Sequence, residues 1–108
     1  MNKLINKIAK KHLKTLLHNI IFNKRRAYKE NYYIFKQALE YAERKLRTLL
    51  INVNGASYQC MICGSRGFTP RGIFLHLIRK HENEIIYLIE DEIEEYLMLH
   101  QQQFKVKQ

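Results

Sequence analysis

Four residues in the middle of the chain have the types and spacing of metal ligands. Two residues separate Cys60 from Cys63, twelve more precede His76, and a further four precede His81. Thiolate sulfur and imidazole nitrogen are preferred ligands of structural zinc, and these intervals fall inside the range of a two-cysteine, two-histidine site. The spacing therefore predicts that one Zn²⁺ binds per chain.

Local geometry explains why the intervals suit one ion. Two cysteines three positions apart sit on a tight turn whose backbone N–H groups can hydrogen-bond the thiolates, and Gly64 suits that turn. Two histidines five positions apart on a helix reach one ion if the last turn loosens. A stray Cys-x-x-Cys beside unrelated histidines is the alternative, as is a redox dithiol, although no strand–helix pattern surrounds the cysteines.

Catalysis is not expected from this sequence. Four protein ligands close a zinc site, whereas a catalytic zinc keeps one position for water. The carboxylates cluster on a stretch of one expected helix, where consecutive acids usually form a solvated face. These residues are Glu90, Asp91, Glu92, Glu94 and Glu95. We therefore expect a binding protein rather than an enzyme.

The segment from Tyr58 to His81 resembles the Cys-Cys-His-His zinc-finger family. Tyr58 stands two residues before the first cysteine, Phe68 lies between Cys63 and the expected helix, and Ile73 stands three residues before His76. Phe68 is displaced by one position from the family pattern. The resemblance implies a ββα fold for this segment, about 24 of the 108 residues.

The family also implies DNA binding through its helix. The positions that would face bases are Thr69, Gly72 and Leu75, and none has the Arg, Lys, Asn or Gln side chain that discriminates guanine or adenine. Arg71 is the one nearby helix residue able to reach a base edge. Base reading by this helix is therefore poorly supported.

The charge of the chain is unevenly distributed. Its formal net charge is +9, with thirteen Lys and Arg against three acids in residues 1–50, and seven acids against two Lys in residues 82–108. A concentrated basic excess favours a polyanionic partner, nucleic acid first and an anionic membrane surface second. The expected phosphate contacts are Lys3, Lys7, Lys10, Lys14, Arg66, Arg71, Arg79 and Lys80.

The lysines near the N-terminus form a stripe on an amphipathic helix predicted over residues 3–22. Lys11 belongs to this stripe with the other four lysines, and Arg25, Arg26 and Lys29 extend it beyond the helix. A phosphate-binding surface, a solvated face and a membrane-surface helix all fit the pattern.

Apolar residues predict a second helix over residues 27–50, since they recur at alternating steps of four and three. This expected buried face consists of Tyr28, Tyr32, Phe35, Leu39, Ala42, Leu46, Leu49 and Val53. Asn52, Asn54 and Gly55 end the helix. Thr69 and Pro70 begin the next one, with Thr69 as its N-cap.

We thus expect a mainly α fold with three regions. Residues 1–54 form a basic helical region, residues 55–81 the zinc finger, and residues 82–108 an acidic C-terminal helix ending near residue 102. No signal peptide and no apolar run long enough to span a bilayer are visible, so an intracellular protein is expected.

The finger helix carries more apolar residues than the zinc site uses. Phe74, Leu75 and Ile78 lie away from the expected ligand face, so another helix of the chain, a second copy or a protein partner must cover them. Composition and the segment 69–81 resemble small zinc-finger regulators of archaeal viruses and plasmids. We therefore expect a DNA-binding transcription regulator, with a protein–protein interaction module as the alternative and no small-molecule substrate.

Overall fold

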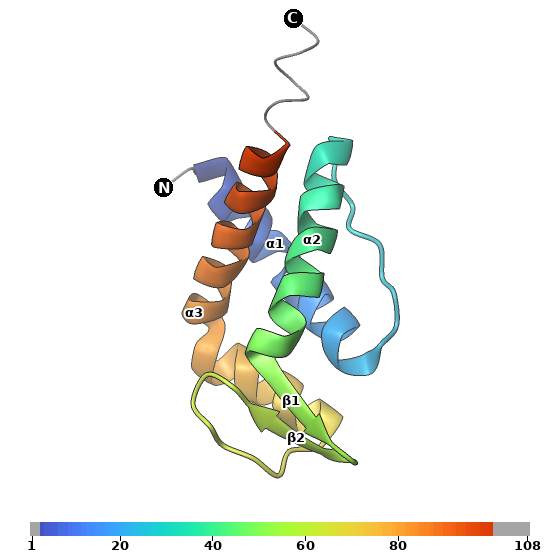
Figure 1. The fold of residues 1–108 in the computed structure, drawn as a ribbon, viewed down its shortest axis with the longest axis vertical. Coiled ribbons are helices and arrows are strands. Elements are labelled where there is room, and N and C mark those ends of the chain that lie inside the picture. The colour runs from blue at the N-terminus through green and yellow to red at the C-terminus, as the bar shows by residue number, and fades with distance from the viewer. Residues whose placement is uncertain (1–2, 101–108) are drawn as a thin grey trace, which may run out of the picture.

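Three helices and one β-hairpin make up the protein (Figure 1). The computed structural model describes residues 3–100. The elements follow in the order α1 (Lys3–Phe22), α2 (Tyr33–Leu50), β1 (Ile51–Asn54), β2 (Ser57–Cys60) and α3 (Pro70–Leu99). The predicted mainly α fold class is confirmed.

The core lies where the three helices meet. Helix α3 packs against both α1 and α2, and α1 passes behind the other two in Figure 1. Burying a Leu or Ile side chain contributes about 1.5–3 kcal/mol, so the aliphatic faces of the helices dominate stability. The largest fully buried apolar side chains are Leu16, Leu17, Leu39, Leu46, Leu50, Ile73, Leu77, Ile85, Ile89 and Ile93. None of the helices within residues 3–100 combines the length and apolar character that crossing a membrane requires.

Helix α2 begins at Tyr33, so the predicted start at residue 27 is wrong. Leu39 and Leu46 are buried as expected, but Tyr32 is 69% exposed and Leu49 is 52% exposed. Leu50 takes the buried position in place of Leu49. An α-helix has 3.6 residues per turn, so a strict seven-residue repeat drifts off the buried face towards its end.

The segment before α2 is held extended by buried hydrogen bonds. Tyr28 is buried, and its hydroxyl donates to Glu43 Oε1 at 2.6 Å. The Asn19 amide donates to the Arg26 carbonyl at 3.0 Å, while the Arg26 N–H donates to Asn19 Oδ1 at 2.8 Å. These side chains satisfy polar groups that a helix would otherwise pair, so the chain follows α1 instead of continuing α2.

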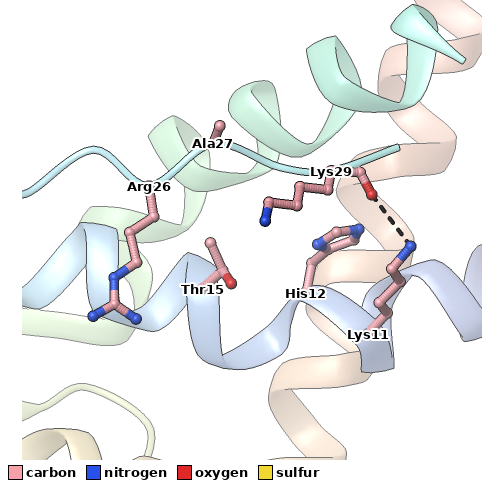
Figure 2. A pocket seen from close by; sticks show the side chains of 6 residues that line it. All are labelled: Lys11, His12, Thr15, Arg26, Ala27 and Lys29. Carbon is pink, nitrogen blue, oxygen red and sulfur yellow. Dashed lines mark hydrogen bonds between the residues drawn. The ribbon is translucent and has the colours of Figure 1, made fainter. Parts of the chain in front are cut away.

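Three further contacts fasten this segment to α1, and Figure 2 draws the one between Lys11 and Lys29. His12 Nε2 lies 2.6 Å from Glu30 Oε2, and Lys11 Nζ lies 3.2 Å from the same oxygen. Lys11 also donates to the Lys29 carbonyl at 3.2 Å. The segment between α1 and α2, which we call the connection, is therefore anchored at several points between Arg26 and Glu30.

The hairpin begins at Ile51, before the predicted finger boundary at residue 55. Its strands are antiparallel, with Asn52 opposite Gln59 and Asn54 opposite Ser57. Gly55, with φ of 65°, makes the tight turn that a side-chain-bearing residue would resist. On its other edge, Tyr58 forms a β-bridge with Phe68 through backbone hydrogen bonds of 2.9 and 3.0 Å.

Helix α3 contains both the finger helix and the acidic helix predicted to follow it. Thr69 caps its start, accepting a hydrogen bond from the Gly72 N–H at 3.0 Å, and Pro70 occupies the first turn as predicted. His81 has non-helical backbone angles (φ −131°, ψ 22°), so the helix kinks there. The expected end near residue 102 lies outside the described residues.

Candidate functional site

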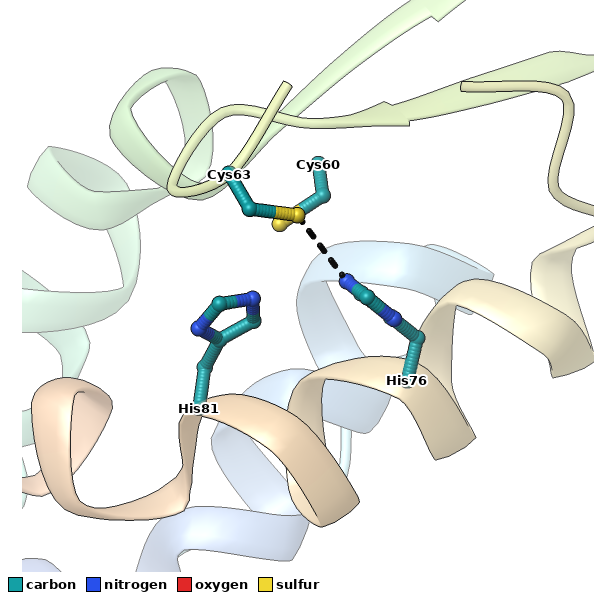
Figure 3. Close-up of side chains that lie close together, drawn as sticks. All are labelled: Cys60, Cys63, His76 and His81. Carbon is teal, nitrogen blue, oxygen red and sulfur yellow. Dashed lines mark hydrogen bonds between the residues drawn. The ribbon is translucent and has the colours of Figure 1, made fainter. Parts of the chain in front are cut away.

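Cys60, Cys63, His76 and His81 lie together between the hairpin and α3 (Figure 3). One donor atom from each side chain falls within 4.8 Å of all the others. Zinc bonds of about 2.0–2.3 Å in a tetrahedron place neighbouring ligand atoms roughly 3.3–3.8 Å apart, so small side-chain adjustments suffice. The predicted ligands are thus close enough to coordinate one metal ion.

Cys60 is the last residue of β2, and Cys63 lies on the tight turn that follows it. The Gly64 N–H donates to the Cys60 carbonyl at 2.8 Å, and the Cys60 N–H donates to the Ser65 carbonyl at 2.8 Å. Gly64 has φ of 86°, a left-handed conformation that glycine adopts without steric cost. The turn therefore brings both sulfurs to the same side.

Hydrogen bonds to the Cys63 sulfur favour its thiolate form. Ser65, through its side chain and its backbone N–H, with further contributions from His81 and His76, lowers the pKa of Cys63 to about 5. Burial raises the pKa of Cys60, against hydrogen bonds from the Cys63 and Ile62 backbone N–H groups. Metal ions bind the thiolate form of cysteine, so Cys63 is already in the form that binds. For Cys60, the positive charge of a bound ion would stabilise the thiolate that burial disfavours.

The kink in α3 explains how two histidines five residues apart face one point. On a regular helix their side chains would diverge by about 140°. The non-helical backbone at His81 turns its ring back towards His76, and the two ring centroids lie 5.1 Å apart. The histidine spacing predicted a loosened helical turn, and the structure has it at His81.

His81 has one nitrogen engaged and one without a partner. Its Nδ1 lies 2.7 Å from Glu84 Oε1, while its Nε2 is buried with no hydrogen-bond partner in the described chain. Burial lowers the pKa of His81, but its hydrogen bond with Glu84 and the nearby negative charges of Glu84 and Cys63 outweigh burial, so the pKa is raised. A ligating histidine commonly bonds a carboxylate through its second nitrogen, and the free Nε2 fits a metal ion.

His76 is positioned by an aromatic neighbour. Its ring lies 4.6 Å from the Phe68 ring, centroid to centroid, and its Nε2 lies 3.4 Å from Cys63 Sγ. Phe68, the aromatic that is one position displaced from the zinc-finger pattern, therefore still packs against a ligand.

The apolar faces of the finger helix are partly covered within the chain. Phe74 and Ile78 are half-buried and pack against the core, and the Phe74 ring lies 6.1 Å from the Phe22 ring of α1. Leu75 is half-buried. The sequence left open whether another helix of the chain, a second copy or a protein partner covers these residues. For Phe74, the covering element is α1 of the same chain.

The predicted phosphate contacts are all exposed, on two separate parts of the fold. Lys3, Lys7, Lys10 and Lys14 lie on α1, whereas Arg71, Arg79 and Lys80 lie on α3 and Arg66 follows the cysteine turn. Within residues 3–100, none of these eight side chains forms an ion pair with a carboxylate. Their charges are therefore not neutralised internally.

A basic groove that the sequence did not single out lies between α1 and the connection (Figure 2). Its volume is about 520 Å³, and its lining residues are Lys11, His12, Thr15, Arg26, Ala27 and Lys29. The absence of any Asp or Glu from residues 1–29 is the sequence signal for it. The groove becomes apparent only when the connection folds back along α1.

Comparisons with protein-family models, curated protein sequences and solved structures found no significant match to this chain.

Proposed function

We propose that the protein binds one structural zinc ion and binds DNA mainly through phosphate contacts, as a regulator of transcription. The observation that supports DNA binding best is the unneutralised basic surface of α1 beside the basic groove. Residues 1–29 contain nine Lys and Arg and no acid. A surface of this kind attracts the phosphate backbone and releases its bound counterions.

Zinc is the metal favoured by the donor set. Two thiolates and two imidazoles suit tetrahedral zinc, whereas carboxylate-rich sites suit magnesium or calcium. When bound, the ion would cross-link the cysteine turn to α3. Cys60, Cys63, His76 and His81 would hold it, and four protein ligands leave no position for a reacting water.

The groove supplies the kind of donors that hold a phosphate. Arg26 and Lys29 extend from the connection towards Thr15 and His12 of α1 (Figure 2). Glu30 is paired with Lys11, so two of the three cations lining the groove have no carboxylate partner among the described residues. The Asn19 contacts fix the Arg26 backbone, which reduces the entropy cost when a ligand binds.

A salt titration of binding to a mixed-sequence DNA duplex tests this proposal. The logarithm of the binding constant should fall linearly with the logarithm of salt concentration. The Arg26→Gln, Lys29→Gln double variant should bind more weakly and show a shallower slope, because each phosphate that is no longer neutralised removes about 0.9 from the slope.

A charge-matched control separates this surface from net charge. Lys36→Gln with Arg44→Gln removes two cations from α2, and we expect little change in slope. Equal effects of the two double variants would contradict a localised phosphate surface. Failure of the parent protein to bind DNA at low salt would exclude the DNA-binding function.

A second candidate function, protein–protein association, is favoured by one observation. An apolar depression of about 440 Å³ lies beside the metal ligands, lined by Ile62, Asn83, Glu84, Tyr87 and Leu88. Tyr87 is 55% exposed. Sedimentation of the parent and of Tyr87→Ser across a range of protein concentrations tests self-association through this surface.

A further inference from the structure

One face of the β-hairpin presents polar side chains of the kind that recognise bases. Asn52 stands opposite Gln59 and Asn54 opposite Ser57, and side chains at alternate positions share one face of a two-stranded sheet. These four residues and Arg66 line one small cavity of about 190 Å³. Arg66, from the turn after the cysteines, therefore lies over the same face.

The other face of the hairpin belongs to the protein interior and the metal centre. Ile51 and Cys60 form a cross-strand pair and are both buried. Tyr58 is half-buried, and its hydroxyl lies 3.4 Å from the Ile21 carbonyl of α1. The inward residues fix the orientation of the hairpin, so the polar face is held outward.

The outward side chains match the requirements of direct base recognition. Asn and Gln can bond adenine through two hydrogen bonds, and Arg can bond guanine in the same way. The Asn52 and Asn54 side chains are exposed and have no hydrogen-bond partner among the described residues. The Gln59 amide donates to the Gly64 carbonyl at 3.2 Å, which ties the turn that precedes Arg66 to this face.

The finger helix offers much less for this purpose. Thr69 is occupied as the helix cap, Gly72 has no side chain, and Leu75 is apolar. We propose that the DNA sequence is read by the polar face of the hairpin, with Asn52, Asn54 and Arg66 contacting base edges in the major groove. This inference rests on the proposed DNA-binding function.

The surroundings of the hairpin suit a ribbon inserted in the major groove. The groove of B-DNA is about 12 Å wide and admits a two-stranded β-ribbon. Tyr58, on the inward face of the hairpin, contacts Ile21, and the exposed Lys24 and Arg26 follow Ile21 within five residues. Arg25 between them is paired with Glu40 and Glu43. If the hairpin enters the groove, we expect Lys24 and Arg26 to contact the phosphates that border it.

Selection from a pool of random-sequence DNA duplexes tests the inference. The zinc-loaded parent protein should enrich one sequence motif. Asn52→Ala with Asn54→Ala should remove from the enriched motif the positions that the two asparagines read, while binding to mixed-sequence DNA and its salt slope stay unchanged. Arg66→Ala should lower the preference for the enriched duplex over a scrambled one by about 5- to 150-fold, the discrimination given by one bidentate contact.

Two controls locate the effect. Val53→Ala changes the opposite face of β1 and should leave the motif intact, and zinc content with thermal melting establishes that each variant is folded. A motif that survives Asn52→Ala with Asn54→Ala but disappears in Arg71→Ala would overturn the inference and assign reading to α3.

The remaining outcomes separate this inference from the function on which it rests. Tight binding to every duplex without an enriched motif would overturn base reading by the hairpin and leave phosphate-based DNA binding standing. No binding to any duplex would overturn both.

Discussion

The Glu84 carboxylate pairs with the His81 ring, with Glu84 Oε1 lying 2.7 Å from His81 Nδ1. This contact orients the ring so that Nε2 faces the other three ligands. Glu84→Gln should therefore weaken metal affinity by about 10- to 100-fold, as removal of such a partner typically does. Competition with a zinc-binding dye measures the change.

Glu82→Gln is the matched control, since Glu82 is an exposed acid on the same helix beyond the reach of these contacts. Equal losses of affinity in the two variants would mean that general negative charge, rather than the contact with His81, supports binding.

Cys63→Ser and His76→Ala should each release the metal, because each removes one of four ligands. Elemental analysis of purified protein should give one zinc per parent chain and much less for either variant. Far-ultraviolet circular dichroism should retain most of the helical signal, since the aliphatic core among the helices stays in place. Folded parent protein that contains no zinc and takes none up would contradict the metal assignment.

Leu39→Ala should lower the free energy of unfolding by about 2–5 kcal/mol, the range for truncating a buried leucine. Leu49→Ala is the contrast, because Leu49 is 52% exposed and its truncation should cost well under about 1 kcal/mol. Urea denaturation measures both. Similar reductions in stability would mean that α2 presents a different face to the core.

Glu30 should make stability depend on pH in the acid range. Burial raises its pKa, but hydrogen bonds with His12 and Lys11 outweigh this and hold the pKa below its ordinary value of 4.5. The unfolded chain then binds the proton more tightly, so this contribution is complete above about pH 4.5 and disappears as pH falls. The difference in free energy of unfolding between the parent and Glu30→Gln should therefore decrease as pH falls below about 4.5, as measured by denaturation at a series of acid pH values.

Lys11→Gln provides the check on Glu30. It removes one of the two contacts that lower the carboxyl pKa, so the midpoint of the acid transition should move towards 4.5. An unchanged midpoint would leave His12 as the sole group acting on Glu30.

Neutralising Lys3, Lys7, Lys10 and Lys14 together should weaken DNA binding about equally for all sequences. The slope of log binding constant against log salt should flatten by up to roughly 0.9 for each phosphate that the variant no longer neutralises. Fluorescence anisotropy at several salt concentrations measures it. Unchanged affinity and slope would show that α1 is not a phosphate surface and would favour protein–protein association.

The candidate metal site was predictable because the residues that form it are specified by local sequence. Cys60 and Cys63 share one turn, His76 and His81 share one helix, and side-chain types with short intervals determine both pairs. The cap at Thr69 is likewise local. Only the contact between the cysteine turn and α3 is long-range. It could be predicted because all four ligands must reach the same ion.

The start of α2 could not be read in this way. Tyr28 satisfies the helical periodicity, yet its hydroxyl bonds Glu43, fifteen residues away, and it lies in extended chain. Strand β1 was missed because Asn52 and Asn54 end helices readily, and their strand conformation depends on pairing with Gln59 and Ser57. In both places a tertiary contact overrides the local preference.

His81 is both a candidate metal ligand and the residue at which α3, a helix of 30 residues, bends. The part of α3 beyond the bend lies along α2, where the Tyr41 hydroxyl bonds Glu95 at 2.6 Å. The backbone angles of His81 set the direction of the part of α3 that follows it. A bound ion would restrict those angles by holding the His81 ring. Metal binding should therefore restrict the bend angle of α3. A pair of spin labels, one on each side of His81, should report a broader distribution of distances when zinc is removed.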